Sequence, residues 1–204
     1  MEMTRLFDLL GHYKENFPNK EVALSFKREG KWINYSVDEY IEMIRLKTAV
    51  LLATSLEIGA IIGGAPSSDS DLLYNYGINL GLAFQLRDDY LDAFGDPKEF
   101  GKQIGGDIKC NKKTFLLLNA LKTAEGATAE NLRNWINANE VNDEKAKIQA
   151  VLDIYRETGA DKRCEEAIQD FFEKSVVCAK SLQLPEYKKD ILINLAYHLM
   201  GRKK

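Results

Sequence analysis

Residues 84–92 read Phe84-Gln85-Leu86-Arg87-Asp88-Asp89-Tyr90-Leu91-Asp92, so an apolar helical run ends in three carboxylates. Residues four apart lie on one face of a helix, which places Asp88 and Asp92 one turn apart with Asp89 beside them. Because like charges at this spacing repel, the cluster favours a bound cation. Mg²⁺ prefers oxygen ligands, takes one or two carboxylates from a protein and completes its coordination with water or phosphate. The stretch therefore predicts a metal platform for a phosphorylated ligand, with a solvated acidic face as the alternative.

Length and composition exclude several classes of protein. The 204 residues are 45% hydrophobic, which suffices for one domain with its own core. The net charge of −3 and the lack of a long basic tract predict no nucleic-acid partner. The three cysteines, Cys110, Cys164 and Cys178, have no C-x-x-C spacing, which argues against a disulfide framework or a zinc site. No stretch approaches the ~20 apolar residues of a membrane span, so we expect no span and a cytoplasmic protein.

The first 35 residues differ from the rest. Residues 21–26 and 31–35 alternate apolar and polar side chains around Arg28-Glu29-Gly30, which predicts a β-hairpin. We expect residues 1–35 to be an N-terminal extension of uncertain origin and residues 36–204 to form a helical unit.

From Ser36 onward the apolar period is helical. Ser36 and Glu39 have the spacing of a capping box, which predicts a long helix over about 37–63. The turn at 63–68 leads into the helix that carries the acidic stretch, and two long helices joined by so short a turn lie antiparallel. A helix that opens at Thr114 and ends at Gly126 is also predicted. Further helices are predicted at 129–138, 143–157, 162–182 and 186–200.

The antiparallel pair places a lysine beside the carboxylates. Lys47 lies sixteen residues before Gly63, and Gln85 lies sixteen residues after Asp69. At a rise of about 1.5 Å per residue the two sit at the same height, so Lys47 and Thr48 are expected to face the acidic stretch. Lys47 also interrupts an apolar run. Because a buried unpaired ammonium costs on the order of several kcal/mol, we expect an anion near it.

The segment after the acidic helix is rich in glycine and lysine. Residues 95–113 hold four glycines, one proline and five lysines, which is incompatible with a stable helix interior. Lysine acts on phosphate as a point charge, and glycine lets the backbone approach it closely. A solvated flexible loop is the alternative. Next to three carboxylates, the composition favours a diphosphate held jointly by metal and lysines.

Taken together, these features resemble the C-terminal portion of the trans-type polyprenyl diphosphate synthase family, which includes farnesyl and geranylgeranyl diphosphate synthases. The resemblance implies an all-α fold, an incomplete helical bundle of the isoprenoid synthase type preceded by the hairpin. Terpene cyclases share an aspartate-rich helix but not the lysine and glycine loop. The ordered set that carries the resemblance is Lys47-Thr48, residues 84–92, Gly101-Lys102, Gly106-Asp107 and Lys112-Lys113-Thr114-Phe115.

The resemblance implies a Mg²⁺-dependent prenyltransferase that condenses an allylic diphosphate with isopentenyl diphosphate in isoprenoid biosynthesis. By motif, Asp88 is the expected metal ligand and Asp89 and Asp92 support it. Asp107 is expected to tie the lysine loop in place. The allylic diphosphate is expected to contact Lys47, Lys102 and Lys112, with Thr48 and Gln85 orienting that group or stabilising the developing cation.

The sequence also departs from the family pattern. A first aspartate-rich motif and an arginine pair, which the family carries in its N-terminal half, do not occur in these 204 residues. The activity of this chain by itself is therefore in question. A noncatalytic partner subunit, a terpene-cyclase-like diphosphate-binding protein and a purely structural helical module stay open as alternatives. We also expect a homo-oligomer, because the family usually forms homodimers and an incomplete bundle exposes apolar helix faces.

Overall fold

The computed structural model describes residues 24–28, 31–96, 104–138 and 143–201. Strands β1 (Leu24–Arg28) and β2 (Lys31–Tyr35) pair antiparallel, with Leu24 opposite Tyr35 and Arg28 opposite Lys31. The predicted hairpin is confirmed over these residues, and residues 21–23 of its expected first strand lie outside the described ranges.

The other regular elements of the described residues are helices, so the predicted all-α class is confirmed. Helices α4 and α10 are the longest, with 28 and 22 residues. In chain order the helices are α2 (Val37–Ile44), the π-helical turn η1 (Arg45–Ala49), α3 (Val50–Ile62), α4 (Ser67–Phe94), α6 (Gly106–Lys109), α7 (Phe115–Thr123), α8 (Gly126–Asn137), α9 (Glu144–Glu157), α10 (Ala160–Ser181) and α11 (Glu186–Met200).

The start of α2 follows the predicted capping box. The backbone N–H of Glu39 donates to Ser36 Oγ at 3.1 Å, and the N–H of Ser36 donates to Glu39 Oε2 at 2.7 Å. The single helix predicted over 37–63 is wrong in one respect, because η1 interrupts it. The N–H of Val50 reaches back five residues to the carbonyl of Arg45. Such a bulge adds one residue between two helical stretches, which an apolar period cannot detect, and bulges of this kind are frequent at functional sites.

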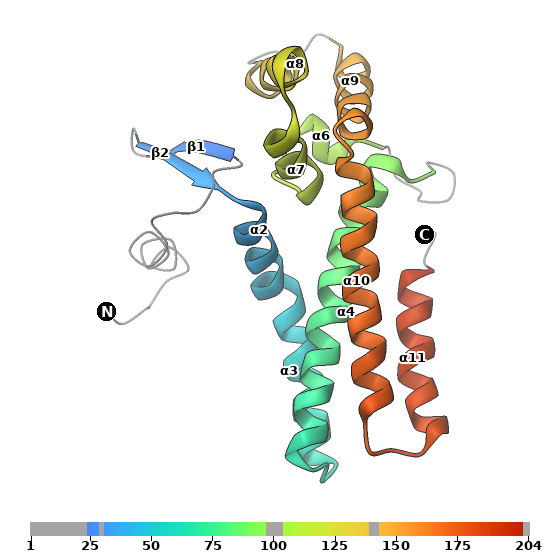
Figure 1. Cartoon of the computed structure of the whole chain (residues 1–204). Helices are drawn as coiled ribbons and strands as arrows, with labels where there is room; N and C mark the ends of the chain where they lie inside the picture. Colours follow the sequence, from blue (N-terminus) through green and yellow to red (C-terminus); the bar gives the residue numbers. More distant parts are fainter. Residues whose placement is uncertain (1–23, 29–30, 97–103, 139–142, 202–204) are drawn as a thin grey trace.

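Helices α3 and α4 lie antiparallel and very close together (Figure 1). A Cβ atom on Gly77 would lie 2.5 Å from Ala53 Cα, and one on Gly81 would lie 2.7 Å from Ala49 Cα. Ala49 and Ala53 are fully buried in this crossing. The small side chains of α3 therefore face α4, and its large aliphatic side chains are left on the outside.

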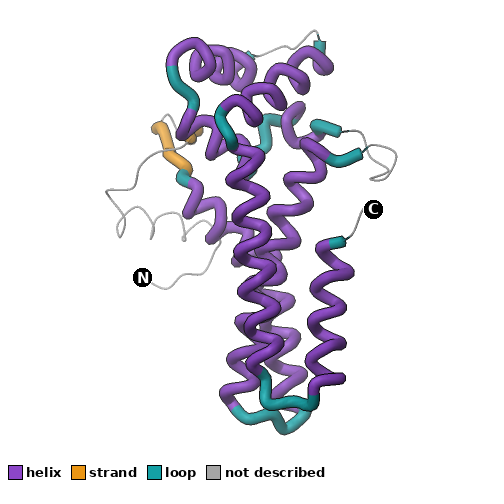
Figure 2. Tube along the Cα trace, turned by 45° about the vertical axis from the view of Figure 1, so that its right-hand side comes forward, coloured by secondary structure: helices purple, strands orange, loops and turns teal. Residues whose placement is uncertain are grey.

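Helices α3, α4, α10 and α11 alternate in direction along one bundle (Figure 1). Helix α10 runs beside α4, and α11 returns beside α10 (Figures 1 and 2). The α3–α4 and α10–α11 turns meet at one end of the bundle, where the carboxylate of Asp69 accepts hydrogen bonds from the N–H of Gln183 at 3.2 Å. Farther along, Tyr76 Oη donates to the carbonyl of Leu192 at 2.8 Å.

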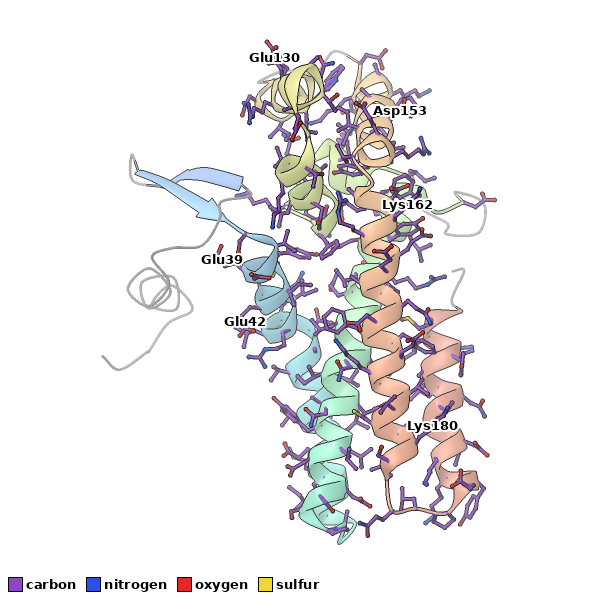
Figure 3. The ribbon with its side chains drawn as sticks, viewed as in Figure 1. Glu39, Glu42, Glu130, Asp153, Lys162 and Lys180 are labelled. Carbon is purple, nitrogen blue, oxygen red and sulfur yellow. The ribbon has the colours of Figure 1, made fainter. Side chains whose placement is uncertain are left out.

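Helices α6, α7, α8 and α9 gather at the opposite end of the bundle (Figure 2). Figure 3 shows Glu130 and Asp153 on α8 and α9 at this end, and Lys162 and Lys180 near the two ends of α10. One core cluster joins α2, α4, α7, α9 and α10, and a second joins α4, α10 and α11. Among the described helices, none is long and apolar enough to cross a membrane.

Two boundaries differ from the sequence prediction. Thr114 does cap α7, since its Oγ accepts from the N–H of Leu117 at 3.3 Å. The helix ends at Thr123, however, and Gly126 begins α8 instead of ending α7. Within the glycine-rich segment, Gly106–Lys109 form one helical turn, which packing against α4 and α9 supports in place of intrinsic propensity.

Candidate functional site

A cavity of about 300 Å³ lies between α2, η1, α4 and the segment that joins α6 to α7. It brings together side chains from three parts of the chain that are far apart in sequence, and three of them were predicted: Lys47, Gln85 and Lys112. The cavity is lined by Tyr40, Met43, Ile44, Lys47, Gln85, Lys112 and Lys113.

The predicted alignment of η1 with α4 is confirmed. Thr48 Oγ1 donates to Gln85 Oε1 at 3.0 Å, and Gln85 Nε2 lies 3.4 Å from Asp89 Oδ1. The burial argument for Lys47 is wrong, because its side chain is exposed at the cavity. The apolar neighbours Leu46 and Leu51 are exposed as well, so the run that carries Lys47 is not a buried run.

Asp89 is the buried carboxylate of the site, with 1% of its surface exposed. Tyr40 Oη donates to its Oδ2, and Lys112 Nζ donates to its Oδ1 at 3.0 Å. Burial raises the pKa of Asp89, and the bonds from Tyr40 and Lys112 offset only part of this rise. Burial also raises the pKa of Tyr40, and the charge of Asp89 raises it further, so the phenol stays protonated.

Lys112 joins two carboxylates. Besides Asp89, its Nζ donates to Asp107 Oδ2 at 2.6 Å. Burial by itself would lower the pKa of the Lys112 ammonium, but the bonds to Asp107 and Asp89 outweigh burial and raise it. Lys112 is therefore a fixed positive charge at the cavity, and Asp107 ties the lysine segment as the sequence predicts.

Asp92 holds the beginning of α6. Its Oδ2 accepts from the N–H of Asp107 at 2.8 Å, and its carbonyl accepts from the N–H of Gly105 at 2.7 Å. Burial raises the pKa of the Asp92 carboxyl, and the bond from the Asp107 backbone opposes that rise. Asp92 thus connects the end of α4 to the segment that carries Lys112.

Asp88 is the exposed member of the acidic stretch. Among the described residues, no hydrogen bond or ion pair to its carboxylate is present. Asp88, Asp89 and Asp92 therefore have three different environments. Lys102, the remaining predicted diphosphate ligand, lies in residues 97–103, outside the described ranges.

The aspartates of the acidic stretch supply carboxylate oxygens, which are the ligands that Mg²⁺ requires. Within the part of the chain that the structure describes, no three His, Cys, Asp or Glu side chains converge as a metal site. Mg²⁺ needs only one or two carboxylates when phosphate and water complete its shell, and the open carboxylate of Asp88 fits that role. Both oxygens of Asp89 are occupied by Tyr40 and Lys112. The assignment of Asp88, Asp89 and Asp92 to metal stays a prediction.

Sequence reasoning missed four cavity residues, and the polar ones among them are Tyr40 and Lys113. Tyr40 lies seven residues before Lys47, which is two helical turns and the same face, so the spacing could have indicated it. Lys113 follows Lys112 directly, and burial lowers its pKa. The burial of Asp89 could not be read from the sequence, because Lys112 is 23 positions away.

The fold and the cavity define the class of protein: an all-helical bundle with lysines gathered beside carboxylates at the end of a long helix. The chain belongs to the polyprenyl synthetase family, whose sequence model matches residues 20–155. This match begins before Ser36, and the division of the chain at residue 35 stays a prediction.

Individual relatives agree with this assignment. The chain is 38% identical over 112 residues to a short chain isoprenyl diphosphate synthase of Methanocaldococcus jannaschii, which covers 55% of this chain and 34% of that protein. A crystal structure of a geranylgeranyl pyrophosphate synthase matches 97% of this chain and 57% of its own, with a TM-score of 0.77 and 37% identity. A crystal structure of the Corynebacterium glutamicum geranylgeranyl pyrophosphate synthase, complexed with isoprenyl diphosphate and magnesium, matches with a TM-score of 0.73 and 31% identity. The match covers 96% of this chain and 51% of that one. The chain thus spans about a third of such curated relatives and about half of the solved structures.

Proposed function

We propose that this chain is the diphosphate-binding part of a Mg²⁺-dependent prenyltransferase that condenses an allylic diphosphate with isopentenyl diphosphate. The observation that carries the proposal is the cavity, where Lys47, Gln85 and Lys112 meet from three separate segments. The relatives support it, since the M. jannaschii protein is named an isoprenyl diphosphate synthase and the C. glutamicum structure contains isoprenyl diphosphate and magnesium.

In this function the bond between the allylic carbon and the diphosphate oxygen breaks, and the diphosphate leaves with the electron pair. Isopentenyl diphosphate then forms the new carbon–carbon bond, and a proton is lost. Lys47, Lys102 and Lys112 stabilise the negative charge that develops on the departing diphosphate. The Thr48–Gln85 pair orients the reacting group. When bound, Mg²⁺ neutralises diphosphate charge, and Asp88 would hold it with support from Asp89 and Asp92.

Calorimetry with inorganic diphosphate and Mg²⁺ tests the site. The native chain is expected to bind, and an Asp88→Ala, Lys102→Ala variant is expected to bind much more weakly. Lys145→Ala, which removes an exposed lysine on α9, serves as the control for general charge effects. Equal binding by the native chain and the double variant would refute the site and favour the structural-module alternative.

A second candidate function is a noncatalytic partner subunit. The observation that favours it is that Tyr40 and Lys112 bond to both oxygens of the Asp89 carboxylate, which leaves Asp88 as the exposed carboxylate of the acidic stretch. Assay with geranyl and isopentenyl diphosphates separates the two. Product from the isolated chain supports the prenyltransferase, whereas product only after a full-length homologue is added supports the subunit.

We also propose a homo-oligomer that works in the cytoplasm. Support for association comes from α3, whose outward face exposes Leu51, Ile58, Ile61 and Ile62. The cysteines are free, which is compatible with a reducing compartment.

A further inference from the structure

Lys147, on the first turns of α9, is a buried lysine outside the cavity. Only 3% of its surface is exposed, whereas Lys145, two residues earlier on the same helix, is exposed. Lys147 Nζ donates to Asn111 Oδ1 at 2.7 Å and to the carbonyl of Lys109 at 3.3 Å. Both acceptors are neutral, and among the described residues no carboxylate lies within ion-pair distance of this ammonium. Burying a charge without a charged partner costs free energy. Packing therefore does not explain why a lysine occupies this position.

Both acceptors lie immediately before the lysines of the cavity. Asn111 has a φ of +50°, in the left-handed region that asparagine tolerates better than most residues. Its Nδ2 donates to the carbonyl of Ile136 at the end of α8, at 3.1 Å. The Asn111 side chain is thus held from both sides, by α8 and by Lys147. The backbone turn at Asn111 sets the direction in which Lys112 and Lys113 leave the chain.

Helix α9 also contacts the earlier part of this segment. Gly105 has a φ of +83°, and a Cβ atom on it would lie 2.7 Å from the side chain of Ile148. Lys109 Nζ pairs with Glu144 Oε1 at 2.8 Å on the surface. The first turns of α9 therefore hold the segment from Gly105 to Asn111 at several points, and Lys147 is the buried polar side chain that α9 contributes to this contact.

We propose that Lys147 is a positioning residue for diphosphate binding. Its ammonium bonds to the carbonyl of Lys109 and to the side chain of Asn111, which holds the left-handed turn and directs Lys112 and Lys113 into the cavity. This inference rests on the proposed function of the cavity. It assigns to Lys147 no contact with the substrate.

Lys147→Met removes the ammonium and keeps the length and apolar stem of the side chain. We expect the folded variant to bind Mg²⁺ with inorganic diphosphate about tenfold more weakly, the scale of one lost hydrogen bond to a charged group. Lys145→Met is the matched control on the same helix and is expected to bind like the native chain. Circular dichroism checks that both variants keep the native helix content. Native-like binding by a folded Lys147→Met variant would overturn the inference.

A double-mutant cycle distinguishes positioning from a general loss of stability. Glycine adopts the left-handed backbone conformation readily, so Asn111→Gly keeps the turn but removes the side-chain oxygen that accepts from Lys147. This variant is therefore expected to weaken diphosphate binding as well. Both changes break the same hydrogen bond, the one between Lys147 and Asn111. The double variant is therefore expected to bind diphosphate with about the same affinity as whichever single variant binds it less tightly. Losses that multiply would show that Lys147 acts independently of the turn, and would overturn the inference.

The failure of the proposed function has a different signature. If the native chain does not bind diphosphate at all, the proposed function of the cavity is refuted. Amide hydrogen exchange then still tests whether the hydrogen bonds of Lys147 hold the segment before Lys112. We expect the amides of residues 105–112 to exchange faster in Lys147→Met while those of α10 are unchanged. Unchanged exchange at residues 105–112 would overturn the role of Lys147 in holding the segment.

Discussion

Asp89 shows how one buried charge organises its neighbours at the residue scale. Its carboxylate is removed from water and receives bonds from Tyr40, on α2, and from Lys112, after α6. A buried charge is stabilised only while such partners are present. Asp89 therefore connects three separate segments, and loss of a partner is expected to affect stability and the shape of the cavity together.

Lys112→Met is expected to destabilise the fold in a way that depends on pH. The folded pKa of Asp89 is raised by burial, so stability falls as pH rises from the unfolded pKa through the folded one. Removing Lys112 raises that pKa further, so the fall in stability extends to higher pH. The Lys112 ammonium itself stays charged below its unfolded pKa of about 10.4, so it adds no slope of its own near neutrality.

We expect Lys112→Met to cost about 2 kcal/mol near neutral pH, less than for a fully buried pair because its side chain is 39% exposed. Urea unfolding at about pH 7.5 and about pH 5 measures the change, and the loss is expected to be smaller at the lower pH because protonation of Asp89, which its raised pKa favours, increases as the pH falls. An Asp89→Asn, Lys112→Met variant is the control and is expected to lose the pH dependence. An equal loss at both pH values would contradict this account.

Tyr40→Phe tests the other partner of Asp89. Deleting the hydroxyl leaves one oxygen of the buried carboxylate without its donor, and a loss of about 1–3 kcal/mol in the free energy of unfolding is expected. Tyr187→Phe, at an exposed position on α11, serves as the control and is expected to change nothing measurable. Chemical denaturation that gave both variants the same midpoint would show that the Tyr40 hydroxyl does not stabilise the fold.

At the scale of elements, the crossing of α3 and α4 depends on small residues. Gly77 lets α4 approach the backbone of α3 at Ala53, and Gly81 lets it approach the last residue of η1, Ala49. This close approach keeps η1 beside α4, where Thr48 bonds to Gln85. The geometry of the site thus depends on two glycines of α4 that lie about one and about two helical turns before the cavity residue Gln85.

Gly77→Ala is expected to destabilise the protein although alanine favours helices. A Cβ at this position meets Ala53 Cα at 2.5 Å, so the two helices must separate. Because the clash is with backbone atoms, the overpacking is expected to cost about 2–3 kcal/mol, which exceeds the gain of about 0.5–1 kcal/mol that alanine contributes by propensity. Thermal unfolding measures the balance.

Gly59→Ala supplies the matched control on α3. A Cβ on Gly59 has no atom within 4 Å, so only the gain in helix propensity of about 0.5–1 kcal/mol is expected. The two substitutions are chemically identical and should change the melting temperature in opposite directions. A rise for both variants would show that α3 and α4 do not pack as closely as the structure has them.

At the scale of the whole molecule, α3 has its apolar side chains on the outside. Leu51 is 75% exposed and Ile62 is 81% exposed. Exposed apolar faces of this kind mark interaction surfaces. The proposed homo-oligomer would cover this face with a second copy of the chain.

Sedimentation velocity tests this proposal directly. The native chain is expected to sediment as an oligomer, and a Leu51→Ser, Ile62→Ser variant is expected to shift toward the single chain because it removes apolar area from the contact. Val177→Ser, which changes an exposed residue on α10, is the control and should leave association intact. A native chain that sediments as a single copy at every concentration would contradict the proposal.

The sequence by itself determined the helices, the capping box at Ser36 and the antiparallel pairing that brings Thr48 to Gln85. These features depend on contacts between residues close in sequence and on the length of a connecting turn, and a local pattern records both. The π-helical turn η1 was not predicted, because one added residue leaves the helical period of apolar residues intact on either side of it.

Only the tertiary structure decided how the charged residues differ from one another. Asp88 and Asp89 are neighbours in sequence, yet one is exposed and the other is buried against Tyr40 and Lys112. Lys145 and Lys147 likewise lie two residues apart, and only Lys147 is buried. The reason is physical: the burial of a charge and its pKa depend on what distant segments pack against it, and no local pattern contains that information.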